Sequence, residues 1–280
     1  MPTAPAPPAR RALQAILFDM DGLLIDSEPL WFEVESEVMA HLGGRWSAAD
    51  QQELVGGSLE RSVDYLLGRA TKAASRDEVG KWLVDGLTAL LRERGVLVLP
   101  GARELLAEVT DAGMPNALVT SSERQIMEAV IPKIGMNFGA TVCAEDVRES
   151  KPAPEPYLLA AELLGVRPDC CVALEDSPNG VASAEAAGCL VVAVPSLLPI
   201  PTRPGRVVAS SLSQIDLAML RLFGAPSERV FGAYEEVAPL AGGWEERVGL
   251  YQLLPLLVHA LLFGGSYCAS AERMALRYAG

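Results

Sequence analysis

Residues 15–28 read AILFDMDGLLIDSE, and this stretch decides the fold. Its short apolar run, residues 15–18, has the length and composition of a buried strand. The run ends on Asp19, and Asp21 follows two positions later. An unpaired charge in an apolar interior is costly. A strand that leads directly into two carboxylates therefore predicts a polar site at its carboxyl end.

Four further apolar runs follow along the chain and alternate with helical patterns. We expect strands at residues 15–18, 117–120, 141–144, 171–174 and 190–194. Helices are expected at residues 123–134, 155–164 and 178–187, the last with Ser177 as its N-cap. The Pro-rich residues 195–204 are interpreted as a surface loop. This alternation predicts an α/β fold with a Rossmann-like parallel sheet, covered by helices on both faces.

Residues 30–97 interrupt the alternation, because they contain amphipathic helical runs and no convincing strand. We predict that they form a helical cap domain inserted after the first strand. Residues 12–29 and 98–215 then form the core domain. A disordered Pro- and Ala-rich tail, residues 1–11, is expected before the core, and a helical C-terminal extension, residues 216–280, after it.

The composition excludes several kinds of partner. A net charge of -13 at pH 7 disfavours nucleic acid, whose phosphates require clustered Lys and Arg. The longest apolar segment, residues 250–263, is too short to span a bilayer, and no export signal is recognised. The five cysteines form no C-x-x-C pair, which is typical of buried thiols in a reducing compartment. We therefore expect a cytoplasmic monomer or weak homodimer that binds neither nucleic acid nor membranes.

Polar side chains follow the expected strands at the point where each strand ends. In an open parallel sheet these ends meet at one edge, where ligands bind. Facing carboxylates require a cation, and hard oxygen ligands suit Mg²⁺. Hydroxyls and free N–H groups at the start of a helix suit a phosphate. A magnesium-dependent phosphoryl-transfer centre is therefore predicted from Asp19, Asp21, Thr120, Ser121, Ser122, Lys151, Glu175 and Asp176.

Two other kinds of site fit these residues less well. A calcium-binding EF-hand loop needs an oxygen ligand at its fifth position and Gly at its sixth. Counted from Asp19, the fifth position is Leu23 and the glycine, Gly22, comes fourth. The chain has only two histidines, His41 and His259, far apart in the sequence, which disfavours a Ser-His-Asp triad or a zinc site. The chemistry is therefore expected to depend on carboxylates.

Four segments, FDMDGLLIDSE, LVTSS, SKPAPEPY and VALEDSPNG, together resemble the four motifs of the haloacid dehalogenase superfamily, over about residues 12–215. More narrowly, they resemble its type-I-capped branch of sugar-phosphate phosphatases and β-phosphoglucomutases. The resemblance implies that Asp19 is a nucleophile that forms an aspartyl-phosphate, and that Asp21 is the general acid and base. It also implies a Mg²⁺ site and a phosphate site, formed respectively by Asp19, the backbone carbonyl of Asp21, Glu175 and Asp176, and by Thr120, Ser121, Ser122 and Lys151.

The function expected from this resemblance is a Mg²⁺-dependent phosphatase of a small phosphorylated metabolite, a sugar or polyol phosphate. The cap would set the substrate specificity, with Trp31, Gly56, Gly57 and Ser58 as candidates. For Trp31, packing within the cap is the alternative role. A phosphosugar mutase and a catalytically silent interaction protein are the alternative functions on the same fold.

A mutase would need cations in the cap to hold a second phosphate. In the β-phosphoglucomutases a His lies twelve residues beyond the nucleophile, and a Lys and an Arg flank the Gly-x-Ser loop of the cap. At the matching positions this chain has Trp31, Val55 and Leu59, none of which can pair with a phosphate. Hydrolysis is therefore expected, although a shifted cap loop would bring Arg61 into that role.

The C-terminal segments DLAMLRLFG, YEEVAPL and GWEERVGLYQLLPLLVHALLFGGSY resemble the C-terminal helices of fructosamine (ketosamine) kinases, over about residues 216–280. Nothing of that family's nucleotide-binding lobe or catalytic loop is recognised in the chain, so kinase activity is not implied. We expect the extension to pack as helices against the core, with a dimerisation or partner surface as the alternative.

Overall fold

The computed structural model describes residues 12–223, apart from residues 55, 136, 204 and 205. The chain divides into two compact units, Met1–Ala225 and Pro226–Gly280, and every described residue belongs to the first. The predicted tail at residues 1–11 lies outside the described residues. Of the predicted C-terminal extension, the described part includes helix α9 (Leu217–Phe223).

Six parallel strands form the main sheet, in the order β5-β4-β1-β6-β7-β8. The strand β1 (Ala15–Phe18) lies between β4 and β6, and Phe18 is opposite both Leu118 and Leu174. The chain fills one side of β1 as far as β5 and then crosses to the other side, so β1 ends at the topological switch point. The expected Rossmann-like α/β fold is confirmed, with the remaining strands at β4 (Asn116–Val119), β5 (Ala140–Val142), β6 (Cys171–Glu175), β7 (Leu190–Ala193) and β8 (Arg206–Val208).

The five predicted strands are present within two residues of their predicted ends. The strand β8 was not predicted, because it has only three residues and follows the Pro-rich segment that we interpreted as a loop. It pairs with β7 at the edge of the sheet, where its side chains are only half-buried.

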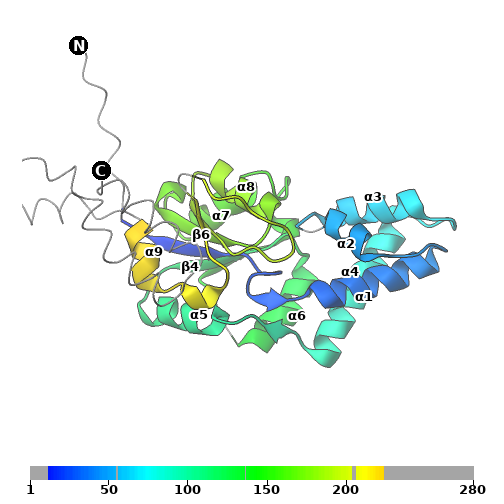
Figure 1. Ribbon diagram of the computed structural model, residues 1–280, viewed down its shortest axis with the longest axis horizontal. Helices are drawn as coiled ribbons and strands as arrows, with labels where there is room; N and C mark the ends of the chain where they lie inside the picture. The colour runs from blue at the N-terminus through cyan, green and yellow to red at the C-terminus, as the bar shows by residue number, and fades with distance from the viewer. Residues whose placement is uncertain (1–11, 55, 136, 204–205, 224–280) are drawn as a thin grey trace, which may run out of the picture. The chain divides into compact units, whose positions relative to one another are not determined.

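Helices cover both faces of the sheet, as expected (Figure 1). Alternate residues of β1 face opposite ways: Ala15 and Leu17 pack with α7 and α8, whereas Ile16 and Phe18 pack with α5 and α6. The core helices are α5 (Ala102–Asp111), α6 (Arg124–Ile134), α7 (Glu155–Leu163) and α8 (Pro178–Ala186), with short 3₁₀ turns at Ala144–Asp146, Pro168–Cys170 and Leu212–Gln214.

The predicted helical insert contains four helices, which lie together beyond the end of β1 in Figure 1. They are α1 (Glu28–His41), α2 (Ala48–Leu54), α3 (Leu59–Arg69) and α4 (Arg76–Arg94). A short antiparallel pair, β2 (Ile25–Asp26) and β3 (Leu97–Val98), joins the outgoing and returning connections of this insert. The sequence did not predict this pair, since two-residue strands carry no periodic signal.

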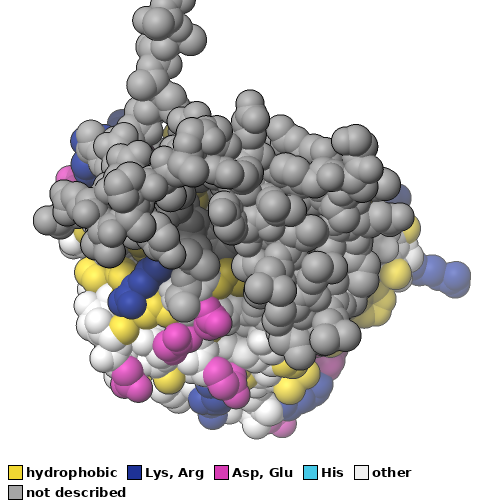
Figure 2. Space-filling view, turned by 60° about the vertical axis from the view of Figure 1, so that its left-hand side comes forward, with side chains coloured by type: hydrophobic (Ala, Val, Ile, Leu, Met, Phe, Trp, Pro, Cys, Tyr) yellow, Lys and Arg dark blue, Asp and Glu magenta, His cyan; other side chains and the backbone are white. Residues whose placement is uncertain are grey.

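The described side chains visible in one space-filling view carry charges of both signs. On the face shown in Figure 2, basic side chains lie interspersed with acidic and apolar ones. Within the described residues, no helix combines the length and apolarity needed to cross a membrane.

Gly101, just before α5, packs against the backbone of Leu212 and Ser213 near the end of the core domain. It has a φ of 88°, and a Cβ there would overlap the backbone of Leu212 and Ser213. Gly113 has a similar φ of 62° but open space around it. We predict that Gly101→Ala lowers the free energy of unfolding by about 2 kcal/mol more than Gly113→Ala, because it adds a backbone clash to the same conformational strain. Urea denaturation measures both variants; equal losses would contradict this packing.

Candidate active site

Asp19 follows the central strand directly, so its position is determined by the sheet. Its backbone N–H donates to the carbonyl of Leu174 (3.1 Å), which extends the pairing of β1 with β6 by one residue. The side chain is only 9% exposed. The fold therefore places a carboxylate at the switch point of the sheet, almost out of reach of bulk water.

Lys151 supplies the positive charge beside Asp19. Its Nζ lies 2.6 Å from Oδ1 of Asp19 and 2.6 Å from Oε1 of Glu175, and it donates to the carbonyl of Val119 at the end of β4 (2.8 Å). Burial alone would lower the pKa of Lys151, but the two carboxylates outweigh it and raise the pKa above its usual value. Lys151 is therefore a fixed cation that joins three neighbouring strands.

Glu175, at the end of β6, is fully buried and receives four hydrogen bonds. Lys151 Nζ and the hydroxyl of Tyr157 (2.5 Å) donate to Oε1, whereas the N–H of Asp176 and the hydroxyl of Ser177 donate to Oε2. Sequence reasoning assigned no role to Tyr157, although it ends the SKPAPEPY segment. The available signal was a tyrosine among the apolar residues of an expected helix, because a buried tyrosine hydroxyl needs a hydrogen-bond partner.

Asp176 belongs to the same cluster of buried carboxylates. The hydroxyl of Ser196 donates to its Oδ2 (2.5 Å), a contact that the sequence did not reveal. The loop after β1 passes so close that a Cβ on Gly22 would overlap the Asp176 carboxylate. Gly22 has a φ of 79°, so both its conformation and this approach require glycine.

The three carboxylates of Asp19, Glu175 and Asp176 offer oxygens that all lie within 4.8 Å of one another. Burial raises the pKa of Asp19 to about 8 despite Lys151, and burial together with Asp19 and Glu175 raises the pKa of Asp176 well above its usual range. Three carboxylates face one lysine, so ionisation of all three is unfavourable without further positive charge. Hard oxygen donors and this need for positive charge fit a bound Mg²⁺.

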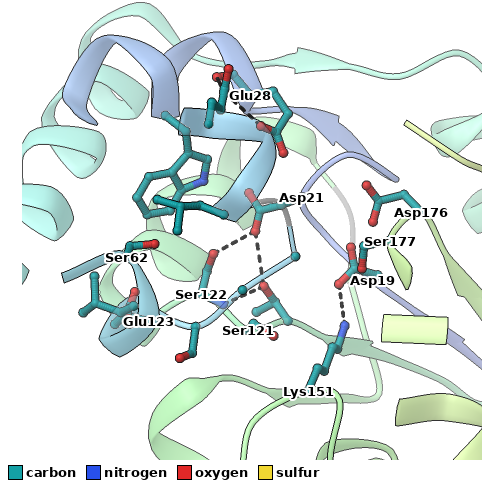
Figure 3. A pocket seen from close by; sticks show the side chains of 18 of the residues that line it. Asp19, Asp21, Glu28, Ser62, Ser121, Ser122, Glu123, Lys151, Asp176 and Ser177 are labelled. Atoms are coloured by element: carbon teal, nitrogen blue, oxygen red, sulfur yellow. Dashed lines mark hydrogen bonds and ion pairs between the residues drawn. The ribbon is translucent and has the colours of Figure 1, made fainter. Parts of the chain in front are cut away.

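The carboxylate of Asp21 lies at the junction between core and helical insert. Ser27, just before α1, donates to Oδ1 (2.6 Å), and Ser122 donates to Oδ2 (2.8 Å). Thr120 also donates to Oδ2 at 3.3 Å and accepts from the N–H of Ser122. Figure 3 shows the Asp21 side chain between Glu28 and Ser122.

One cavity joins most of the predicted site residues. It is lined by Asp19, Asp21, Thr120, Ser121, Ser122, Lys151 and Asp176 from the core, and by Trp31, Gly56, Gly57 and Ser58 from the insert. Glu175 does not line the cavity, because it lies behind Lys151. Leu59 lines it as well, whereas Val55 lies outside the described residues.

The insert reaches the core beside this cavity. The amide of Asn179, in α8, donates to the carbonyl of Gly56 (3.0 Å). Gly56 has a φ of 65°, and a Cβ there would come within 2.7 Å of Cβ of Ser177. The loop between α2 and α3 is thus packed tightly against the start of α8, and it closes that side of the cavity.

Sequence reasoning missed three glutamates that also line the cavity: Glu28 and Glu35 from α1, and Glu123 at the start of α6. Burial raises the pKa of Glu28 and Glu123 to about 7 and that of Glu35 to about 8. Neighbouring acids, such as Asp21 for Glu28 and Glu28 for Glu35, add to this effect. Glu28 ends the FDMDGLLIDSE segment, but sequence reasoning gave it no role, and Glu35 and Glu123 lie in none of the four segments.

Comparison with known proteins places this geometry in a family. The family model described as haloacid dehalogenase-like hydrolase matches residues 13–188, and that of fructosamine kinase matches residues 211–278. The chain is 38% identical to hexitol phosphatase B of Escherichia coli (strain K12) over 190 residues, 66% of this chain and 85% of the relative. It is 30% identical to the fructose-1-phosphate phosphatase YqaB of the same strain over 178 residues, 62% and 92% of the two chains.

A solved structure supports the same assignment. A CbbY mutant from Rhodobacter sphaeroides, in complex with xylulose-(1,5)bisphosphate, superposes with a TM-score of 0.70 at 28% identity. The match covers 75% of this chain and 100% of that one.

Lys151 allows the first test of this site. We predict that Lys151→Met lowers the free energy of unfolding of the metal-free protein by about 3 kcal/mol or more, because Asp19 and Glu175 lose the cation that makes their burial tolerable. Lys133→Met, which removes an exposed lysine from α6, should change it by less than about 0.5 kcal/mol. Urea denaturation compares the two, and a Lys151→Met protein as stable as the control would contradict the assigned ion pairs.

Proposed function

The chain belongs to the haloacid dehalogenase-like hydrolase family and is a phosphoric monoester hydrolase, and we propose that it acts on a small phosphorylated sugar or polyol. One observation carries the proposal: Asp19, its partner Lys151 and Asp176 meet in a cavity at the switch point of the sheet. Relatives named as phosphatases of hexitols and of fructose 1-phosphate support a sugar or polyol as the leaving group.

In the first step of the proposed reaction, an oxygen of Asp19 attacks the phosphorus atom. The bond between phosphorus and the leaving oxygen breaks, and Asp21 gives its proton to that oxygen. In the second step, water attacks the phosphorus of the aspartyl-phosphate and passes a proton to Asp21. The bond to Asp19 breaks, phosphate leaves, and both side chains return to their starting states.

The surroundings of each carboxylate suit its role. Lys151 keeps Asp19 in place and neutralises charge beside the attacked phosphorus. Asp21 is held by Ser27 and Ser122, so it faces the cavity from a position that both the core and the insert define. Thus the nucleophile and the proton carrier are oriented by different groups.

The transferring phosphoryl group would be bound by Lys151, Thr120 and Ser121, which line the cavity beside Asp19. Mg²⁺, when bound, neutralises charge on the phosphoryl oxygens. Asp19, Asp176 and the backbone carbonyl of Asp21 would hold it. We assign Glu175 to the orientation of Lys151, or to a contact with the metal through water, since its oxygens already accept four hydrogen bonds.

The competing functions have less support. A catalytically silent protein would have no reason to retain Asp19, Lys151 and Asp176 in contact. A mutase would need a second cationic site, and Lys151 is the one basic side chain among the described residues that line the cavity. We further propose a cytoplasmic enzyme, since the four cysteines within the described residues are all buried, as in proteins of reducing compartments.

Replacement of the nucleophile is the most direct test. Asp19→Asn should reduce phosphate release from hexitol and hexose phosphates by about 10⁴-fold or more, because an amide cannot form the aspartyl-phosphate. Its melting temperature should not fall, since Asn keeps an oxygen for Lys151 and removes a charge that burial opposes. Asp111→Asn, an exposed change at the end of α5, should retain activity. A fully active Asp19→Asn enzyme would contradict the proposal.

Asp21 is tested by comparing leaving groups. Asp21→Asn should lower the rate with an alkyl phosphate by about 100-fold or more, because the alkoxide then leaves without a proton. With p-nitrophenyl phosphate the first step should suffer much less, since nitrophenolate leaves without protonation. Burst kinetics separate the two steps. Equal losses in the first step for both substrates would count against Asp21 as the general acid.

A further inference from the structure

Three glutamates line the cavity in addition to the phosphate-binding residues: Glu28 and Glu35 come from α1, and Glu123 directly follows Ser122 at the start of α6. Figure 3 shows Glu28 and Glu123 on opposite sides of the pocket, each well apart from Lys151. Glu35 lies in α1, two turns after Glu28, and is only 4% exposed. We call Glu28, Glu35 and Glu123 the acidic lining.

Neighbouring side chains hold two members of the acidic lining in place. The amide of Gln51 donates to both the carbonyl (2.8 Å) and the carboxylate (3.1 Å) of Glu28. The indole N–H of Trp46 donates to Glu35 (3.1 Å). Within the described chain, the Glu123 carboxylate has no hydrogen bond to any other residue. These carboxylates therefore belong to a built surface that keeps acceptor oxygens for a ligand.

No second cation balances the acidic lining. Among the described residues that line the cavity, Lys151 is the single basic side chain, and Asp19 and Glu175 already engage it. The guanidinium of Arg61 instead donates to the carbonyl of Glu53, and Arg61 does not line the cavity. The sequence left Arg61 open as a partner for a second phosphate; in the structure it points to the backbone of α2.

Two uncharged groups complete this part of the cavity. Ser62 is 9% exposed, and no other described residue hydrogen-bonds its hydroxyl, which Figure 3 shows turned toward the pocket. This hydroxyl is at the cavity wall, where a ligand can hydrogen-bond with it. The ring of Trp31 also lines the cavity and offers an apolar surface. Carboxylates, a hydroxyl and an aromatic face together suit a chain of C–H and O–H groups.

We propose that the acidic lining determines the substrate class: it binds the hydroxyl groups of an uncharged polyol or sugar and rejects a leaving group that carries a second anion. This inference rests on the proposed phosphatase function and names its substrate class. Hydroxyls donate hydrogen bonds to carboxyl oxygens of Glu28, Glu35 and Glu123, whereas a carboxylate or a second phosphate would meet acidic groups that either repel it or must take up protons to accommodate it. Bisphosphates and phosphorylated sugar acids are therefore poor substrates.

This expectation separates the chain from a protein of the same fold. The similar CbbY structure contains xylulose-(1,5)bisphosphate, a ligand with two phosphates. In this chain one phosphate can use Lys151 and the metal site, and the other would lie against the acidic lining. The substrate specificity of this chain would then differ from that of CbbY, although both proteins share the phosphate-binding half of the site.

The test compares sorbitol 6-phosphate with gluconate 6-phosphate, which differ in one terminal group, a hydroxymethyl against a carboxylate. Each is measured as a substrate and as a competitor of p-nitrophenyl phosphate hydrolysis. The wild-type enzyme should prefer the polyol by about 100-fold in kcat/KM and in inhibition constant. Glu28→Gln, Glu35→Gln and Glu123→Gln should each narrow this preference, by about tenfold for the best of them.

Glu128→Gln, an exposed change in the same helix as Glu123, is the matched control and should keep the full preference. Equal treatment of the two ligands by the wild-type enzyme would overturn the inference. The inference would also be overturned if all three glutamine variants kept the preference for sorbitol 6-phosphate, because the rejection of gluconate 6-phosphate would then arise elsewhere in the site. Failure to hydrolyse any phosphate monoester, p-nitrophenyl phosphate included, would instead remove the proposed function itself.

Discussion

The structure depends on the buried contact of Lys151 with Asp19 and Glu175. Two carboxylates at the ends of neighbouring strands repel each other and lose their hydration, so their burial is costly without a cation. One ammonium group satisfies both and also binds the carbonyl that ends β4. The lysine therefore joins β4, β1 and β6 at their carboxyl ends and creates the electrostatic conditions for the proposed phosphoryl transfer.

The cavity has two halves of different chemistry. The half formed by the sheet contains Lys151 and the carboxylates that fit Mg²⁺, and it suits a phosphoryl group. The half that involves the insert contains Glu28 and Glu35 and suits hydroxyl groups. Because the first half comes from strand ends and the second largely from the insert, the same core can serve different substrates when the insert changes.

Much of the fold and of the phosphate-binding half could be predicted from sequence. Strand ends carry their polar residues to one edge, so Asp19, Lys151 and Asp176 could be grouped without coordinates. Contacts that arise only from tertiary approach could not be predicted: Tyr157 with Glu175, and Ser196 with Asp176. The acidic lining is of the same kind, since Glu28 and Glu35 from α1 meet Glu123 from the core only through tertiary approach.

The central claim is that Asp19 becomes phosphorylated during turnover. The direct measurement is to quench the enzyme with acid while it hydrolyses a hexitol phosphate in the presence of Mg²⁺, reduce it with borohydride and analyse its peptides by mass spectrometry. An aspartyl-phosphate is reduced to homoserine, whereas a free carboxylate is not. The account predicts homoserine at position 19 alone, and only when substrate and Mg²⁺ are both present. Unmodified Asp19 during steady turnover, or homoserine at another carboxylate, would contradict it.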